Sequence, residues 1–163
     1  MIIREIALNE TWFLKEMLYE ALFVPEGHPK LPRTILDDPA LSKYIENWGK
    51  DDLDVGIVAE HHGDLIGAIW GRLFSTDNKG YGFIDEETPE LSMAVKENHR
   101  GKGIGTKLLD AVSEAYKHKG VKALSLSVDK QNLAFKLYKR AGFETVWENE
   151  TSATMKKADK LRS

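Results

Sequence analysis

A short segment rich in glycine and basic residues carries the clearest chemical signal in this sequence. Arg100-Gly101-Lys102-Gly103-Ile104-Gly105 follows an alternating apolar run and opens an amphipathic one, which predicts a strand, a turn and the start of a helix. The first N–H groups of a helix have no partner within it, and the helix dipole adds partial positive charge there. Glycines let the backbone approach a ligand closely. We therefore predict a site for a ligand with linked phosphates, with added charge from Arg100, Lys102 and Lys107.

Two familiar phosphate-binding loops fit this segment poorly. A Walker A loop requires Gly-Lys followed by Ser or Thr, whereas Gly105 is followed by Thr106 and Lys107. A dinucleotide fingerprint requires G-x-G-x-x-G, and Thr106 stands at its last glycine position, although Asp129 ends the next predicted strand, where a ribose-binding carboxylate would lie. That fold also needs successive β-α-β units, while a hairpin precedes this segment. A dinucleotide-binding enzyme is therefore the less favoured alternative.

The surrounding elements predict one mixed α/β domain over residues 1–163, in which this loop joins a strand to a helix. Asn9 is expected to cap the first helix, and Asp38-Pro39 to start the second. The upstream hairpin requires the sheet to be largely antiparallel there. The expected elements are a strand at 2–6, helices at 10–23 and 39–48, a hairpin of 55–59 and 65–74, a strand at 91–95, a helix at 103–119, a strand at 121–128, a helix at 133–141 and a hairpin of 143–148 and 151–156.

Composition excludes several classes of site. A chain of 163 residues suits one domain, and 42% hydrophobic and 30% charged residues are ordinary for a globular protein. There is no cysteine, so disulfides, thiolate metal sites and a cysteine nucleophile are excluded. Charges at positions 4 and 5 come too early for a secretory signal, and no apolar run approaches the ~18 residues of a membrane span. We therefore expect a cytoplasmic protein with no membrane partner.

Charge is divided unevenly along the chain. Residues 1–90 carry a net charge of -10 and residues 91–163 a net charge of +7, although the whole chain has only -3. This division fits either solvated faces, or a basic half for a polyanion beside an acidic half that attracts a cation. The basic residues lie along predicted helices without interleaved aromatic residues, so no nucleic-acid partner is expected. His28, His61 and His62 show no metal-ligand pattern, so no metal is expected.

Two motifs together resemble the GNAT superfamily of N-acetyltransferases. Arg100-x-x-Gly103-x-Gly105, after the strand at 91–95, resembles the superfamily's acetyl-CoA loop. Asn132-Leu133-Ala134-Phe135-Lys136-Leu137-Tyr138-Lys139-Arg140-Ala141-Gly142-Phe143 resembles its second motif, one helix and one strand further on. The resemblance covers residues 90–145, and the upstream order of elements extends it. It implies an α/β fold with a GNAT-like mixed, mostly antiparallel central sheet, helices on both faces and a splayed parallel strand pair.

The resemblance implies that acetyl-CoA is the co-substrate, with an acceptor half at about 1–89 and an acetyl-CoA half at about 90–157. The CoA pyrophosphate would lie on backbone N–H groups of the loop, and the pantetheine arm would bond to the preceding strand like an added β-strand. An N–H near Ala94 would polarise the thioester carbonyl. Asn132 would contact CoA, cap the short helix, or do both. The implied cofactor-binding residues are Met93, Ala94, Val95, Arg100, Gly101, Lys102, Gly103, Ile104, Gly105, Thr106, Asn132 and Tyr138.

The resemblance also assigns Tyr138 as the general acid that protonates the departing thiolate, with a core tyrosine as the alternative. A phenol with pKa near 10 stays protonated at neutral pH. An amine acceptor with pKa ~10.4 needs a base, because freeing its lone pair at pH 7 costs about 4.6 kcal/mol. Glu90, at the head of the loop-bearing strand, is the leading candidate, followed by Asp85, Glu86 and Glu87. A solvated acidic turn is the alternative for all four.

The acceptor site is the part that the sequence defines least. Its expected walls are the segment 25–34 together with Trp70, Arg72, Tyr81 and Phe83, although aromatic residues at these positions also suit a core. No cysteine or activated serine offers a covalent acyl-enzyme, so we predict direct transfer of the acetyl group to a primary amine of a small molecule or peptide. A non-catalytic CoA-binding regulatory module of the same fold is the alternative. Homodimers are common in this superfamily, but the sequence predicts no interface.

Overall fold

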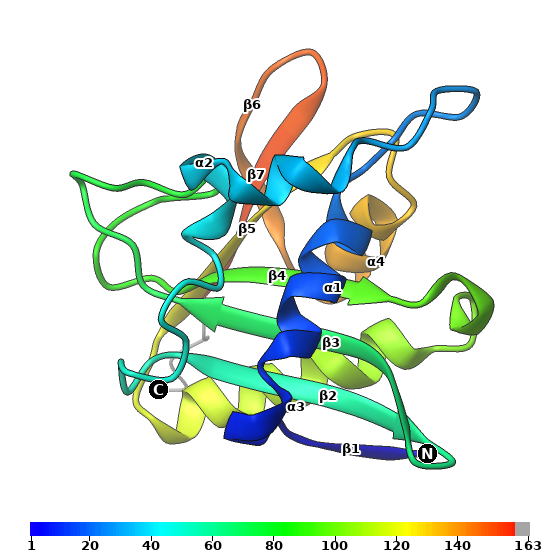
Figure 1. Cartoon of the computed structure of the whole chain (residues 1–163). Helices are drawn as coiled ribbons and strands as arrows, with labels where there is room; N and C mark the ends of the chain where they lie inside the picture. Colours follow the sequence, from blue (N-terminus) through cyan, green and yellow to red (C-terminus); the bar gives the residue numbers. More distant parts are fainter. Residues whose placement is uncertain (159–163) are drawn as a thin grey trace.

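A computed structural model of the chain describes residues 1–158, which form a seven-stranded sheet with helices on both faces (Figure 1). The strand order is β1-β2-β3-β4-β5-β7-β6, and every neighbouring pair is antiparallel except β4 with β5. This confirms the mixed, mostly antiparallel sheet predicted from the sequence. The elements are β1 (Ile2–Glu5), η1 (Leu8–Glu10), α1 (Trp12–Ala21), η2 (Arg33–Asp37), α2 (Pro39–Ser42), β2 (Val55–His61), β3 (Asp64–Arg72), β4 (Glu90–Val95), η3 (Glu97–His99), α3 (Ile104–His118), β5 (Ala123–Asp129), α4 (Ala134–Arg140), β6 (Glu144–Glu148) and β7 (Ser152–Ala158).

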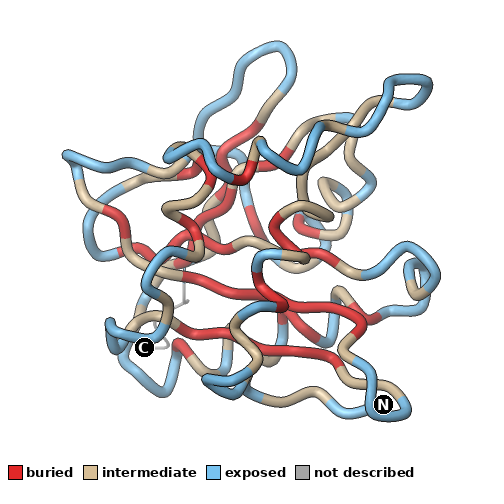
Figure 2. The backbone as a smooth tube through the Cα atoms, viewed as in Figure 1, coloured by how far each residue is buried: buried red, intermediate tan, exposed pale blue. Residues whose placement is uncertain are grey.

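Two apolar clusters hold helices against opposite faces of the sheet. α1 lies across one face in Figure 1, and its buried side chains pack with Trp70 of β3. α3 lies behind the sheet and buries one stripe at helical spacing, formed by Ile104, Leu108, Leu109, Val112 and Tyr116. Figure 2 shows the result: β2 and β3 are buried along most of their length, while the connections are exposed.

The parallel pair β4–β5 is the narrowest connection in the sheet. β4 pairs with β3 over six residues, but with β5 only at Glu90–Ser125 and Leu91–Leu126. The two strands therefore part after Leu91, as the resemblance implied. Lys96 N–H donates to the Ile66 carbonyl at 2.8 Å, so the alternation of an antiparallel ladder turns the backbone groups of Ala94 toward β3. The N–H and C=O groups of Met93 and Val95 consequently face the opening.

The start of the first helix differs from the prediction. Asn9 does not cap it: residues 8–10 form a 3₁₀ turn, and α1 begins at Trp12. The reason is Glu10, whose carboxylate accepts the Ala7 N–H at 2.8 Å and is paired with Arg4 of β1 at 2.7 Å. Because these contacts hold residues 7–10 against the edge strand of the sheet, the helix begins two residues later than predicted. Trp12, the first residue of α1, is 62% exposed.

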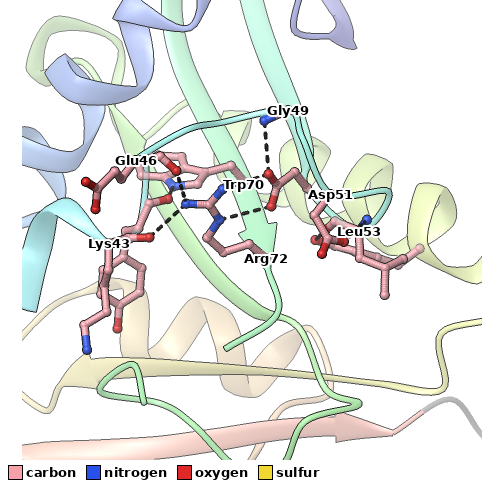
Figure 3. Close-up of polar contacts among 10 residues, drawn as sticks. Lys43, Glu46, Gly49, Asp51, Leu53, Trp70 and Arg72 are labelled. Carbon is pink, nitrogen blue, oxygen red and sulfur yellow. Dashed lines mark hydrogen bonds and ion pairs between the residues drawn. The ribbon is translucent and has the colours of Figure 1, made fainter. Parts of the chain in front are cut away.

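The second helix is also shorter than predicted. Asp38 caps it as expected, accepting the Ala40 N–H at 2.9 Å, but α2 ends at Ser42 and turns follow. Arg72 satisfies the carbonyls that these turns leave free, donating to Lys43 at 2.9 Å and Glu46 at 2.7 Å, while it pairs with the buried Asp54 at 2.7 Å (Figure 3). The guanidinium of Arg72 therefore supports the fold at this point.

Candidate active site

A cleft of about 1040 Å³ opens where β4 and β5 part. All the cofactor-binding residues predicted from the sequence line it except Lys102. Glu90 and Tyr138, the two residues predicted to transfer protons, lie on its lining as well. The strand, the glycine loop and the short helix predicted to bind one ligand are therefore brought to one place, although more than 40 residues separate the ends of that region.

Two glycines shape the loop at the start of α3. Gly101 and Gly103 have φ of +75° and +80°, in the left-handed region that side chains disfavour. Gly103 stands at the N-cap position and no side chain caps the helix, so its first N–H groups, on Ile104, Gly105 and Thr106, keep their capacity to bind an anion. The 15-residue length of α3 gives its dipole full effect at this end.

Arg100 does more than provide charge to the loop. Its Nε donates to the Val95 carbonyl at 2.9 Å, and its Nη2 lies 3.4 Å from the Glu20 carboxylate at the end of α1. The side chain therefore fixes the end of β4 relative to the loop and uses one of the Val95 backbone groups. Lys102 is exposed and does not line the cleft. Its contact with CoA therefore remains a prediction.

Asn132 and Tyr138 both lie on the far wall of the cleft, beside β5. Asn132 Oδ1 accepts the Ala134 N–H at 2.9 Å, which caps the turn into α4, while the residue also lines the cleft. Both roles expected for it are therefore compatible. Tyr138 is buried, with its ring 5.9 Å from that of Phe143 in an edge-to-face arrangement. Burial raises the pKa of the Tyr138 phenol, which keeps it protonated near neutral pH.

Glu90, at the start of β4, lines the cleft and is almost completely buried. It is only 3% exposed, and its Oε2 accepts a hydrogen bond from the Tyr44 hydroxyl at 2.5 Å. Burial raises the pKa of Glu90 to about 7, and the hydrogen bond from Tyr44 opposes that rise. The Tyr44 hydroxyl in turn accepts the Tyr81 N–H at 2.7 Å. Sequence reasoning missed Tyr44, because at helical spacing beside Leu41 it has the pattern of an ordinary core residue.

The other predicted acids and walls are distributed differently. Asp85, Glu86 and Glu87 do not line the cleft. Asp85 accepts Thr88 Oγ1 at 2.8 Å and the Glu87 N–H, contacts that lower the pKa of Asp85, and Glu86 accepts the Thr76 N–H. These carboxylates shape the turn, which was the alternative considered for them. Of the expected walls, Lys30, Leu31 and Tyr81 line the cleft, whereas Trp70 is a core residue and Arg72 belongs to the network of Figure 3.

The acceptor end of the cleft is largely apolar. Phe23, Val24 and Leu31, from the connection between α1 and η2, line it together with Leu41 and Tyr81, and Lys30 of the same connection adds one cation. None of these five apolar residues belongs to either of the two apolar core clusters, although Leu41 is buried. Within the described residues, no group of three His, Cys, Asp or Glu side chains could hold a metal ion. No helix in residues 1–158 is long and apolar enough to span a membrane.

These features define a class: α/β proteins whose sheet opens at one parallel pair, beside a glycine loop at a helix N-terminus. The model of the acetyltransferase (GNAT) family matches residues 14–143, and the chain belongs to that family.

Two curated relatives are similar over part of their length. A mycothiol acetyltransferase of Propionibacterium freudenreichii subsp. shermanii is 28% identical over 120 residues, which are 73% of this chain and 36% of that protein. A protein named uncharacterized N-acetyltransferase YobR, from Bacillus subtilis, is 37% identical over 71 residues, 43% of this chain and 26% of that protein. The chain thus matches about a third and a quarter of the lengths of these two relatives.

Solved structures share the fold over nearly the whole chain. PaiA N-acetyltransferase from Thermoplasma acidophilum, in complex with coenzyme A, has a TM-score of 0.69 at 20% identity, covering 96% of this chain and 98% of that one. YncA from Salmonella typhimurium, with its cofactor acetyl-CoA, has a TM-score of 0.66 at 19% identity, covering 100% and 96%. At these identities the likeness shows the fold.

Proposed function

We propose that this protein transfers an acetyl group from acetyl-CoA directly to a primary amine of a small molecule or peptide. One observation carries the proposal: the parting of β4 from β5 brings an anion-binding helix start, outward-facing backbone groups and two proton-transfer side chains to a single cleft. The chain has no cysteine to carry an acyl-enzyme, so both substrates would occupy the cleft together.

The loop and β4 would hold acetyl-CoA. The N–H groups of residues 101–106 and the dipole of α3 suit a pyrophosphate. The N–H and C=O groups of Met93 and the N–H of Val95 face the opening and suit the amides of a pantetheine arm, whereas the Val95 carbonyl already accepts from Arg100. Of the backbone donors near Ala94, those of Met93 and Val95 are the ones turned toward a thioester oxygen.

Glu90 and Tyr138 would divide the proton transfers between them. A carboxyl group with pKa about 7 is suited to accept a proton from an ammonium near neutral pH, which leaves the nitrogen lone pair free to attack. Tyr138, kept neutral by burial, would give its proton to the departing sulfur. Both side chains line the same cleft, Glu90 from the start of β4 and Tyr138 from α4, which supports this division of roles.

The residues that line the acceptor end of the cleft favour an amine whose remaining atoms are mostly apolar. Five of the side chains that line the acceptor end are aliphatic or aromatic, Lys30 is the cation among them, and Glu90 is the buried carboxyl group there. A polyamine or an aminoglycoside would leave further cations against apolar walls without partners, which is costly. We therefore place arylalkylamines, alkylamines and apolar peptide N-termini ahead of polycations as acceptors.

Thermal unfolding with added ligands tests the co-substrate. Acetyl-CoA and CoA should raise the melting temperature, whereas NAD and ATP should not. At a ligand concentration of 100 Kd, the free energy of unfolding should increase by about 2.7 kcal/mol. Stabilisation by NAD alone would contradict the proposal and favour a dinucleotide-binding enzyme.

A panel of amines scored by thiol release tests the reaction. Apolar monoamines should give the highest kcat/KM, followed by polar monoamines, and polyamines the lowest. Binding of acetyl-CoA without thiol release on any amine would favour a regulatory CoA-binding module instead.

A further inference from the structure

Tyr81 is a large aromatic side chain that the fold leaves exposed in the cleft. Among the Phe, Tyr and Trp residues that the structure describes, the exposed ones are Trp12, Tyr81 and Trp147, and only Tyr81 lines the cleft. It is 64% exposed. Phe83, two residues later, packs instead against the core cluster that contains Trp70. One short segment therefore gives one aromatic ring to the core and leaves the other for whatever enters the cleft.

The backbone on both sides of Tyr81 packs closely against the ends of β4 and β5. A Cβ at Gly80 would lie 2.2 Å from Glu90 Oε1, and a Cβ at Gly82 would lie 2.6 Å from the Leu126 carbonyl carbon. Neither glycine has room for a side chain, so position 81 is the one in this three-residue segment that can carry one. Because Gly80 lies directly against Glu90, the Tyr81 side chain begins one residue away from the proposed base.

Hydrogen bonds fix the backbone that carries Tyr81. Its N–H donates to the Tyr44 hydroxyl at 2.7 Å, and the Phe83 N–H donates to the Gly80 carbonyl at 3.2 Å, which closes a turn around residue 81. The position of the ring is therefore restricted before a ligand arrives. A tyrosine has few rotatable bonds, so it provides a large contact area at a low cost in conformational entropy.

We propose that Tyr81 selects the acceptor by packing against an aromatic ring of the amine, so that arylalkylamines are preferred to alkylamines of the same size. The acceptor nitrogen has to approach Glu90, and a ring carried a short distance from that nitrogen would lie beside Tyr81. Aromatic pairs contribute a roughly 2- to 12-fold gain in affinity beyond the area that they bury. The inference rests on the proposed function, because its ligand is the acceptor amine of that reaction.

A matched pair of amines isolates the ring contact. Phenethylamine and cyclohexylethylamine have the same linker and a similar size, but only phenethylamine is aromatic. The ratio of their kcat/KM values, phenethylamine over cyclohexylethylamine, should fall roughly 2- to 12-fold in Tyr81→Leu, which keeps an apolar side chain and removes the ring. Tyr81→Phe retains the ring and should retain the ratio. The acetyl-CoA Kd should be the same in both variants as in the wild type.

Trp147→Leu is the matched control. Trp147 lies on β6, is 59% exposed and does not line the cleft, so its replacement removes an equally exposed aromatic ring elsewhere on the protein. The ratio for the two amines should stay at the wild-type value in this variant. An unchanged ratio in Tyr81→Leu, or an equal fall in Trp147→Leu, would overturn the proposal.

Calorimetry on the protein saturated with CoA tests the contact without turnover. The ratio of the two amine Kd values should change in Tyr81→Leu by the same factor as the ratio of kcat/KM values. If Tyr81→Leu weakens phenethylamine binding selectively but no amine gives thiol release, the proposed function fails, although Tyr81 still recognises the amine. If thiol is released and both ratios are unchanged in Tyr81→Leu, the proposed function stands and the role of Tyr81 is refuted.

Discussion

The Tyr44 hydroxyl lies 2.5 Å from Oε2 of Glu90 and joins three segments that are distant in the sequence. It donates to the carboxyl group at the head of β4 and accepts the Tyr81 N–H, while Tyr44 itself follows α2. The carbonyl of Tyr44 accepts from the Trp70 indole at 3.2 Å, which fixes its backbone. A buried carboxyl group is thus held in one orientation by the hydrogen bond to its Oε2.

Tyr44→Phe should move the pH dependence of the reaction. The Tyr44 hydrogen bond favours ionised Glu90, so its loss should raise the pKa of Glu90 further above 7. The acid limb of kcat/KM should shift upward by about one pH unit, since hydrogen bonds to charged groups contribute roughly 1.5–3 kcal/mol. Activity at pH 7 should fall several-fold and recover at higher pH.

Tyr116→Phe is the matched control for this change. Tyr116 is also buried and its hydroxyl donates to the Leu53 carbonyl at 2.8 Å, but it lies on the other face of the sheet. It should lose stability of about 1 kcal/mol without moving the acid limb. An acid limb that stays in place in Tyr44→Phe would show that Glu90 is not the titrating base.

Glu90→Gln should lower kcat and should increase the free energy of unfolding near neutral pH. The pKa of Glu90 is 4.5 when unfolded and about 7 when folded, so its favourable contribution is present below pH 4.5 and is lost as pH rises through 7. At about 1.36 kcal/mol per pKa unit, the wild type should lose about 3 kcal/mol of unfolding free energy between pH 4.5 and 8 that the variant retains. Denaturant unfolding across this range measures it, and parallel curves for the two proteins would contradict it. At pH 7.5 the kcat of the variant should fall roughly 100-fold.

Tyr138→Phe should separate chemistry from binding. The phenyl ring keeps the packing against Phe143, so acetyl-CoA affinity should be unchanged by calorimetry. Without a proton for the departing sulfur, kcat should fall roughly 100-fold. Normal turnover in this variant would make Tyr138 a core residue only.

Gly103→Ala should weaken acetyl-CoA binding beyond its effect on stability. A left-handed conformation costs a non-glycine residue about 1–2 kcal/mol. Gly120, at the other end of α3, has φ of +79° against +80° for Gly103, and a Cβ at either position meets no protein atom within 4 Å. Gly103→Ala and Gly120→Ala should therefore destabilise the protein equally. Only Gly103→Ala should raise the acetyl-CoA Kd, and equal Kd values would exclude this loop as the phosphate site.

The sequence predicted the sheet and the long helix well because their signals are local. Periodicity placed β4 and α3 within a residue or two, and turn residues placed the hairpin at His62 and Gly63, where φ is positive as a tight turn requires. The sequence-based prediction was wrong where contacts between distant residues determine the ends of a helix. The Arg4–Glu10 pair delays α1, and Arg72 stabilises the turns after α2 by binding the carbonyls of Lys43 and Glu46.

The candidate site shows the same division. The glycine loop could be found because glycine, charge and helix start are adjacent in sequence. Tyr44 could not, since its partner Glu90 is 46 residues away and a buried tyrosine at helical spacing has no mark of function.

The junction of β4 and β5 has a mechanical consequence. Seven residue pairs join β5 to β7 and six join β3 to β4, but two join β4 to β5. The sheet thus consists of two parts, β1–β4 and β5–β7, which are joined by few backbone hydrogen bonds. Under the proposed function, a ligand that bonds to β4 and reaches β5 would take the place of the missing strand pairing, so binding of the substrate would also make the sheet more rigid.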